Sequence, residues 1–241
     1  IRDYRGGGRA SARETAARVA AGAVAQLVLD SYQIKIQSYT IALGGIQSNG
    51  FDAHAIEKNP FKCPDMEAAK KMEKRIETVK SQGDSLGGIV EIKAVNVPAG
   101  IGDPVFDKLD ADIAKAMMSI GAVKAVEIGA GFLAPEMTGF ENNDPLTLEG
   151  FVSNHSGGIL AGISNGDEIV VRVHVKPIPS ILKVQKTLTD QGVPTTVSTK
   201  GRHDICAIPR INMVCESMLA LVLTDHILRQ KTLGQNFDPI F

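Results

Sequence analysis

Residues 11–30, SARETAARVAAGAVAQLVLD, carry the strongest structural signal in the sequence. Alanine is the best helix former, and the apolar residues of this stretch recur at helical spacing. Ser11 followed three residues later by Glu14 is the pattern of a capping box, which predicts that the helix begins there. Because small side chains let neighbouring helices approach closely, we expect this helix to be central and buried.

Beyond this helix, the periodicity of apolar residues predicts the other helices and strands. Further helices are expected over 65–80, 107–120 and 209–232, and strands over 34–43, 89–97, 122–128 and 169–176. The segment 129–166 is rich in glycine and is expected to be mostly loop. Since helices and strands do not alternate regularly, a doubly wound parallel sheet is disfavoured, and the predicted class is α+β with antiparallel sheets.

Composition excludes several classes of protein. The chain has 241 residues, a net charge of −1 and 44% hydrophobic residues, which is too apolar for a disordered chain. The balanced charge argues against a broad nucleic-acid surface. The sequence has no uninterrupted run of ~18 apolar residues, so no membrane-spanning helix is predicted. Three cysteines without the spacing of a zinc site indicate reduced thiols in a cytoplasmic protein, and no metal site is expected.

A glycine-rich basic loop, residues 5–11, precedes the first helix. Its glycines allow backbone N–H groups to approach an anion, and the following helix start adds partial positive charge. Arg5, Arg9 and Arg13 add formal charge, so a phosphate or carboxylate is the natural ligand. A flexible basic surface loop is the alternative, because neither a dinucleotide fingerprint nor a P-loop lysine is present.

Three further polar segments could carry chemistry. Lys200–Asp204 combines cations, an imidazole and a carboxylate just before the last helix, which suits anion binding and proton transfer. The alternative is a loop in which the aspartate pairs with an arginine and the histidine is solvated. Lys176–Ser180 either holds functional side chains at a strand end or merely ends an edge strand. Asn154–Gly158 is a polar loop whose glycines allow close backbone approach.

Together these segments resemble chorismate synthase. Gly8–Thr15, continuing through Val19 and Gly22, fits one characteristic family pattern, and Arg202–Cys206, continuing through Glu216–Met218, fits a second, with Ile205 where proline is common. Shorter family segments occur between them in the family's order: Gly83–Gly88, Val97–Gly100, Phe106–Asp112, Ser153–His155 and Lys176–Pro177. The resemblance covers nearly the whole chain.

The resemblance implies a fold and a reaction. The family fold is a β-α-β sandwich with a helical core between antiparallel sheets, assembled as a homotetramer. The family enzymes convert 5-enolpyruvylshikimate 3-phosphate into chorismate and phosphate by a 1,4-anti-elimination, a step in aromatic amino acid biosynthesis. They require reduced FMN without net redox change, and some members also reduce their own flavin, with NADP as the associated cofactor.

The resemblance also implies site residues. Asp204 matches the carboxylate that assists deprotonation through the flavin. Substrate-binding positions correspond to Ser11, Arg13 and Arg202. Flavin-binding positions correspond to Arg9, Ala10, Ser11, Gly121, Ala122, Ala161, Lys176, Pro177, Ile178, Pro179, Ser180 and Arg202.

The family's opening segment, with its Gly-Glu-Ser-His-Gly motif and two functional histidines, has no counterpart here. We therefore expect residues 1–241 to form a single family domain truncated at its N-terminus, with little or no activity alone. The alternative function is a non-catalytic chain that binds FMN or a phosphate ligand.

Overall fold

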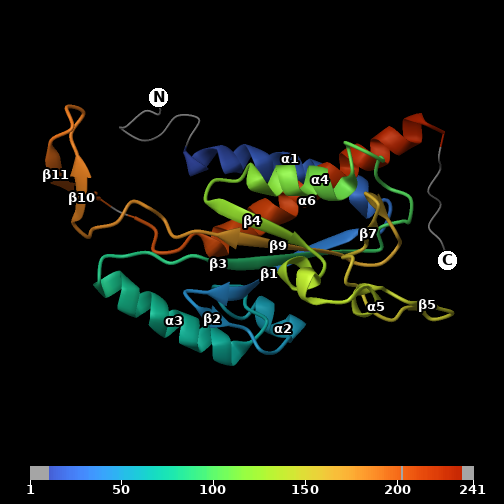
Figure 1. The fold of residues 1–241 in the computed structure, drawn as a ribbon, viewed down its shortest axis with the longest axis horizontal. Coiled ribbons are helices and arrows are strands. Elements are labelled where there is room, and N and C mark those ends of the chain that lie inside the picture. Colours follow the sequence, from blue (N-terminus) through green and yellow to red (C-terminus); the bar gives the residue numbers. More distant parts are fainter. Residues whose placement is uncertain (1–10, 202, 235–241) are drawn as a thin grey trace. The chain divides into compact units, whose positions relative to one another are not determined.

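The computed structural model of the chain describes residues 11–201 and 203–234 (Figure 1). The predicted site residues Arg9, Ala10 and Arg202 lie outside the described residues, as does Arg5. The structure divides into two compact units: Ile1–Ser38, Glu91–Val173 and Asn212–Phe241 form the first, and Tyr39–Val90 and His174–Ile211 form the second. The expected single domain over residues 1–241 stays a prediction.

Helices and strands of the described residues follow the predicted order. The helices are η2 (Ala12–Glu14), α1 (Thr15–Asp30), α2 (Ala53–Ile56), α3 (Met66–Ser81), α4 (Leu109–Met118), η3 (Gly131–Glu136), α5 (Gly139–Asn142) and α6 (Ile208–Thr232). The strands are β1 (Lys35–Leu43), β2 (Ile46–Gln47), β3 (Gly88–Val95), β4 (Val123–Ile128), β5 (Leu146–Thr147), β6 (Gly150–Phe151), β7 (Ile159–Leu160), β8 (Ile163–Ser164), β9 (Ile169–Val175), β10 (Gln185–Leu188) and β11 (Pro194–Val197). Outside the first helix, each predicted element is present within two residues of its predicted ends.

The largest sheet has five strands in the order β2-β1-β3-β9-β4. β1 and β2 pair antiparallel, with Leu43 opposite Ile46, and the hairpins β5–β6, β7–β8 and β10–β11 are also antiparallel. Consecutive residues Ile169–Val171 of β9 are all buried, so this strand is covered on both faces of the sheet. The mixture of helices and antiparallel pairs confirms the predicted α+β class. Cys63, Cys206 and Cys215 are free thiols, as predicted.

Helix α1 begins differently from the prediction. The Ser11 hydroxyl accepts a hydrogen bond from the Arg13 N–H at 3.3 Å, and a single 3-10 turn precedes the α-helix. The Glu14 carboxylate contacts Arg18 at 2.7 Å instead of returning to Ser11. The expected capping box is therefore wrong, because an arginine one turn ahead attracts the carboxylate more strongly than a neutral N–H does.

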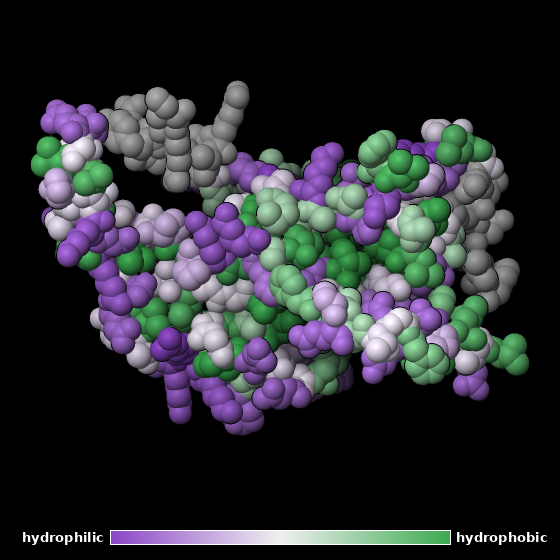
Figure 2. Space-filling view, in the orientation of Figure 1, coloured by the Kyte–Doolittle hydropathy of each residue, from purple (hydrophilic) through white to green (hydrophobic). Residues whose placement is uncertain are grey.

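Burial of α1 is restricted to one face. Gly22, Ala25 and Leu29 are buried, whereas Val24 and Leu27 are 65% and 72% exposed. The expectation of a central, buried helix holds for this one face only, since an alanine-rich sequence is apolar on every face and periodicity cannot show which faces are covered. Apolar side chains are also exposed on the β5–β6 hairpin (Figure 2), and Leu146 and Leu148 are among them.

In the first unit, α1 and α6 cross at very short range (Figure 1). A Cβ atom placed on Gly22 would lie 2.4 Å from the Cβ atom of Ser217. One turn further along α1, the Ala25 carbonyl accepts a hydrogen bond from the Thr224 hydroxyl of α6 at 3.3 Å. The absent side chain at Gly22 therefore determines how closely the two helices pack.

Helix α6 is long and apolar enough, by length and composition alone, to cross a membrane. However, 61% of its most apolar stretch is buried inside the structure, as in the core helix of a folded domain. The sequence rule of uninterrupted apolar residues overlooked this helix because polar residues, such as Asn212 and Thr224, interrupt it.

The β10–β11 hairpin is exposed along its whole length. Leu188 pairs with Pro194 and Gln185 with Val197, and all eight strand residues are exposed. A two-stranded ribbon without a covering layer is only marginally stable in water.

We predict that Gly22→Ala lowers the free energy of unfolding by about 1–3 kcal/mol, because the new methyl group overpacks the crossing with Ser217. Urea unfolding followed by circular dichroism measures the change. Gly50→Ala is the matched control, since a Cβ atom there meets nothing within 4 Å. A Gly22→Ala variant as stable as the control would contradict this account of the crossing.

Candidate functional site

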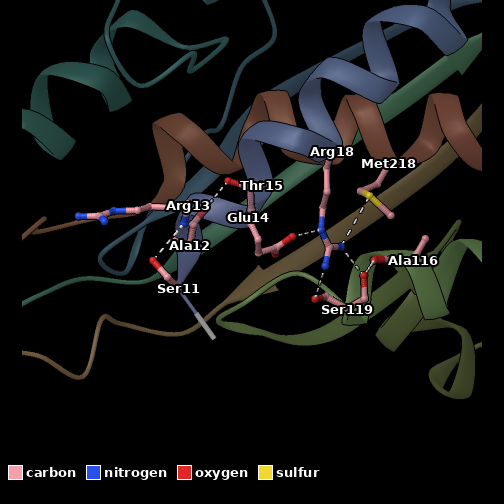
Figure 3. Close-up of polar contacts among 9 residues, drawn as sticks. All are labelled: Ser11, Ala12, Arg13, Glu14, Thr15, Arg18, Ala116, Ser119 and Met218. Carbon is pink, nitrogen blue, oxygen red and sulfur yellow. Dashed lines mark hydrogen bonds and ion pairs between the residues drawn. The ribbon is translucent and has the colours of Figure 1, made fainter. Parts of the chain in front are cut away.

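The turn before α1 presents the first group of predicted site residues. Ser11 caps the 3-10 turn, and the Thr15 hydroxyl bonds the Ala12 carbonyl at 2.6 Å. The exposed Arg13 side chain extends away from the polar cluster formed by Glu14 and its partners (Figure 3). A cation beside a helix start is suited to bind an anion, as the sequence predicts for Arg13.

Arg18 connects this turn to another predicted site segment. Its guanidinium contacts the Glu14 carboxylate, the Ser119 hydroxyl at 2.5 Å, the Ser119 carbonyl at 3.2 Å and the Met218 sulfur at 3.7 Å (Figure 3). Ser119 is the C-cap of α4 and lies two residues before Gly121. Arg18 thereby ties the helix that follows Ser11 to the segment that leads into Gly121 and Ala122.

The predicted flavin contacts Ala122 and Ala161 share an unusual backbone. Their φ angles are +75° and +53°, in the left-handed region that costs an ordinary residue roughly 1–2 kcal/mol. Ala161 and Gly162, both with positive φ, form the two-residue turn between β7 and β8, which is the dihedral pattern of a type I′ turn. Strained backbone of this kind is found preferentially at ligand sites. Gly121 is exposed, and a Cβ atom there would meet nothing within 4 Å.

The remaining described site residues belong to the second unit. Lys176 and Pro177 are exposed directly after β9, and Ile178 is half-buried. Asp204 lies four residues before α6, is 49% exposed and forms an ion pair with Arg210. His203 contacts the Thr199 carbonyl at 3.1 Å. The alternative considered for this loop, an aspartate paired with an arginine, therefore describes Asp204, although the arginine is Arg210.

The structure groups the site residues by unit. Ser11, Arg13, Gly121, Ala122 and Ala161 are in the first unit, and Lys176–Ser180 and Asp204 are in the second. Within residues 11–201 and 203–234, no three His, Cys, Asp or Glu side chains are grouped to hold a metal ion.

Asp144 organises the polar loop that contains His155. Its buried carboxylate accepts hydrogen bonds from the His155 N–H at 2.7 Å, the Ser156 N–H at 2.8 Å and the Ser153 hydroxyl at 2.7 Å. Burial raises the pKa of Asp144, but the hydrogen bonds from Ser156, His155 and Ser153 outweigh burial and lower the pKa to about 2. The loop is thus held by one carboxylate.

Sequence reasoning missed both Arg18 and Asp144. A signal existed for Arg18, because it is a lone cation four residues after Glu14 within an apolar helix. Nothing in the sequence marks Asp144, whose partners are nine to twelve residues away and are mostly backbone groups.

Comparisons with known proteins give a consistent result. The family model described as chorismate synthase matches residues 1–228. A chorismate synthase of Desulfatibacillum aliphaticivorans is 63% identical over 230 residues, covering 95% of this chain and 64% of that protein. One from Desulfosudis oleivorans is 61% identical over 234 residues, covering 97% and 66%. The chain therefore spans slightly less than two thirds of the length of these relatives.

A solved structure supports the same conclusion about the fold. A protein described as "Crystal Structure of Chorismate Synthase" superposes with a TM-score of 0.76 at 36% identity, covering 95% of this chain and 67% of that one. The resemblance and the fold class inferred from the sequence motifs are confirmed.

We predict that Arg18→Met lowers the free energy of unfolding by about 1–3 kcal/mol, since Glu14 and the Ser119 carbonyl lose a charged partner. Arg13→Met is the matched control, because the exposed Arg13 side chain extends away from the cluster. Its effect should stay within about 0.5 kcal/mol in urea unfolding. Equal stability of the two variants would refute the structural role of Arg18.

For Asp144, the depressed pKa predicts a pH dependence. The stabilisation is fully present above the ordinary pKa of 3.8 and is lost as the pH falls toward about 2. Asp144→Asn should lower the free energy of unfolding at pH 7 by about 2 kcal/mol and flatten its decline between pH 4 and pH 2. Unfolding curves at several pH values test this, with Asp107→Asn, an exposed carboxylate, as control. A decline as steep as that of the parent chain would argue against the assignment.

Proposed function

Because the chain belongs to the chorismate synthase family, we propose that it serves the conversion of 5-enolpyruvylshikimate 3-phosphate into chorismate and phosphate. The observation that carries this proposal is the family match over residues 1–228, which includes both long motifs. We further propose that it acts as a lyase with reduced FMN as its cofactor, as the family resemblance implies. Homotetrameric assembly and cytoplasmic location are further parts of the proposal, and the exposed Val24 and Leu27 on α1 would suit assembly.

The described residues fit an anionic substrate. Arg13 places an exposed cation beside the Ser11 cap, and Lys176 places another directly after β9. We assign substrate binding to Ser11 and Arg13, with Arg202 as a further contact. Backbone N–H groups at a helix start favour phosphate for the same electrostatic reason.

The backbone conformations also fit a flavin. Left-handed turns at Ala122 and Ala161 carry only a methyl group each, so a planar ring system can approach the peptide groups closely. We assign FMN binding to Ser11, Gly121, Ala122 and Ala161, to Lys176–Ser180, and to Arg9, Ala10 and Arg202, with Lys176 as partner of the FMN phosphate. Reduced FMN would supply transient electron density that helps to expel phosphate.

Asp204 is the proposed proton-transfer residue of this chain. A carboxylate can accept a proton when a carbon–hydrogen bond is broken beside it, and about half of the Asp204 side chain is exposed for this purpose. The ion pair with Arg210 fixes its orientation. Use of NADP by the chain stays a prediction from the resemblance.

A non-catalytic chain that binds FMN or phosphate is the second candidate. It is favoured by the same ion pair, because an Asp204 carboxylate engaged by Arg210 is less available as a base. The two candidates share their binding residues and differ only in turnover.

Two measurements on the chain of 241 residues test the proposal. FMN fluorescence titration should show saturable binding, and binding should tighten when 5-enolpyruvylshikimate 3-phosphate is present. Phosphate release with reduced FMN then separates an enzyme from a binding chain. Absence of any FMN binding would overturn the enzyme, and a chain that binds neither FMN nor phosphate would overturn the second candidate as well.

In the enzyme, Asp204→Asn should lower the rate of phosphate release by about 100-fold or more while FMN binding persists. Asp190→Asn, an exposed carboxylate between β10 and β11, is the matched control and should keep the parent rate. An unchanged rate in Asp204→Asn would remove Asp204 from the mechanism.

A further inference from the structure

The turn Gly83–Gly88 lies along the segment that contains Lys176–Ser180, and both belong to the second unit. The Ser85 hydroxyl donates a hydrogen bond to the Ile178 carbonyl at 2.6 Å. The Leu182 N–H donates to the Gly83 carbonyl at 3.0 Å, and the Lys183 ammonium contacts the Asp84 carboxylate at 2.6 Å. Three bonds thus join consecutive residues of the turn to one stretch of chain.

The turn also approaches the beginning of that stretch. A Cβ atom on Gly87 would lie 2.3 Å from the Val175 carbonyl oxygen and 3.0 Å from the Pro177 nitrogen. Only glycine allows this approach of two backbones. The turn therefore contacts the beginning of Lys176–Ser180 through Gly87 and its middle through Ser85.

Lys176–Ser180 has few amide groups that could anchor it by hydrogen bonds, although its prolines restrict their own φ angles. Pro177 and Pro179 have no N–H group to donate, so Ile178 supplies the single amide donor among these three residues. The Ile178 carbonyl is the group that Ser85 binds, and Ser85 is only 8% exposed. Because water competes weakly at a buried hydroxyl, this bond holds the segment more firmly than a surface bond would.

The same turn holds the segment after Asp204. The Leu86 N–H donates to the Ile205 carbonyl at 2.8 Å, and Leu86 forms a parallel bridge with Cys206. Ile205 follows Asp204 directly. One turn of six residues is therefore bonded to the proposed flavin-binding segment and to the residue next to the proposed proton-transfer carboxylate.

We propose that the Gly83–Gly88 turn positions Lys176–Ser180 for FMN and that Ser85 is its positioning residue. The Ser85 hydroxyl fixes the Ile178 carbonyl and thereby orients the backbone between the two prolines. Gly87 and Leu86 set the same turn against Val175 and Ile205, so the flavin segment and the Asp204 loop share one support. This inference rests on the proposed function, because it takes Lys176–Ser180 as the FMN-binding segment.

The test compares Ser85→Ala with a matched variant in the chain of 241 residues. Ser81→Ala removes a hydroxyl that makes the same kind of bond, to the Thr78 carbonyl at 2.8 Å, at the exposed end of α3. In FMN titrations, Ser85→Ala should weaken binding about tenfold, the usual scale of one buried hydrogen bond. Ser81→Ala should bind like the parent, and Ser85→Thr, which keeps the hydroxyl, should restore most of the affinity.

Amide hydrogen exchange without FMN tests the positioning separately from the proposed function. Ser85→Ala should speed exchange of the Ile178 and Leu182 amides while the β10–β11 amides keep the parent rates. A parent chain that binds no FMN would overturn the proposed function, whereas faster exchange in Ser85→Ala would still support the anchoring. Unchanged exchange in Ser85→Ala would overturn the anchoring whether or not FMN binds.

A second variant covers the case in which Ser85→Ala does not fold. Lys183→Met breaks the partly exposed pair with Asp84 and leaves the buried bonds intact. It should speed exchange of the Leu182 amide about twofold. If Ser85→Ala is unfolded and Lys183→Met exchanges like the parent, the turn does not position the segment.

Discussion

The close crossing of α1 and α6 at Gly22 and Ser217 is the constraint on which the first unit depends. Two backbones can pack this closely only where one residue has no side chain. The crossing brings Ala25 within hydrogen-bond distance of Thr224, and Arg18 within reach of Met218. Because Arg18 also binds Ser119, the position of α1 on α6 is coupled to the end of α4. The turn that carries Ser11 and Arg13 is therefore held by packing that lies one to three helical turns away from it.

Much of the architecture could be predicted from the sequence, for a clear physical reason. Buried faces produce periodicities of 3.6 and 2 that can be counted, and α3, α4, β1 and β9 follow them closely. The start of α1 could not be predicted, because Glu14 had two competing partners and only the structure shows that Arg18 wins. The exposure of Val24 and Leu27 could not be predicted either, because the identity of an apolar residue does not show whether another part of the chain covers it.

The candidate site shows a similar division. The motifs predict Ser11, Arg13, Ala122, Ala161, Lys176 and Asp204 as site residues, and these assignments stay predictions. The residues that support the site segments and the neighbouring polar loop were not predicted. Asp144 and Ser85 act mainly through backbone partners, and Arg18 also binds one carbonyl; a backbone atom has the same chemistry at every position of a sequence. Supporting contacts of this kind become visible only when the chain is folded.

The left-handed backbone at Ala122 and Ala161 also restricts how these positions can evolve. Every alanine codon becomes a glycine codon or a valine codon by a single change of its second base. Glycine adopts a positive φ without steric cost, whereas valine, branched at Cβ, is a severe outlier there. Two changes of the same base therefore have opposite consequences for the protein. At these two positions, the positive φ angle therefore means that selection removes the valine variant rather than the glycine variant.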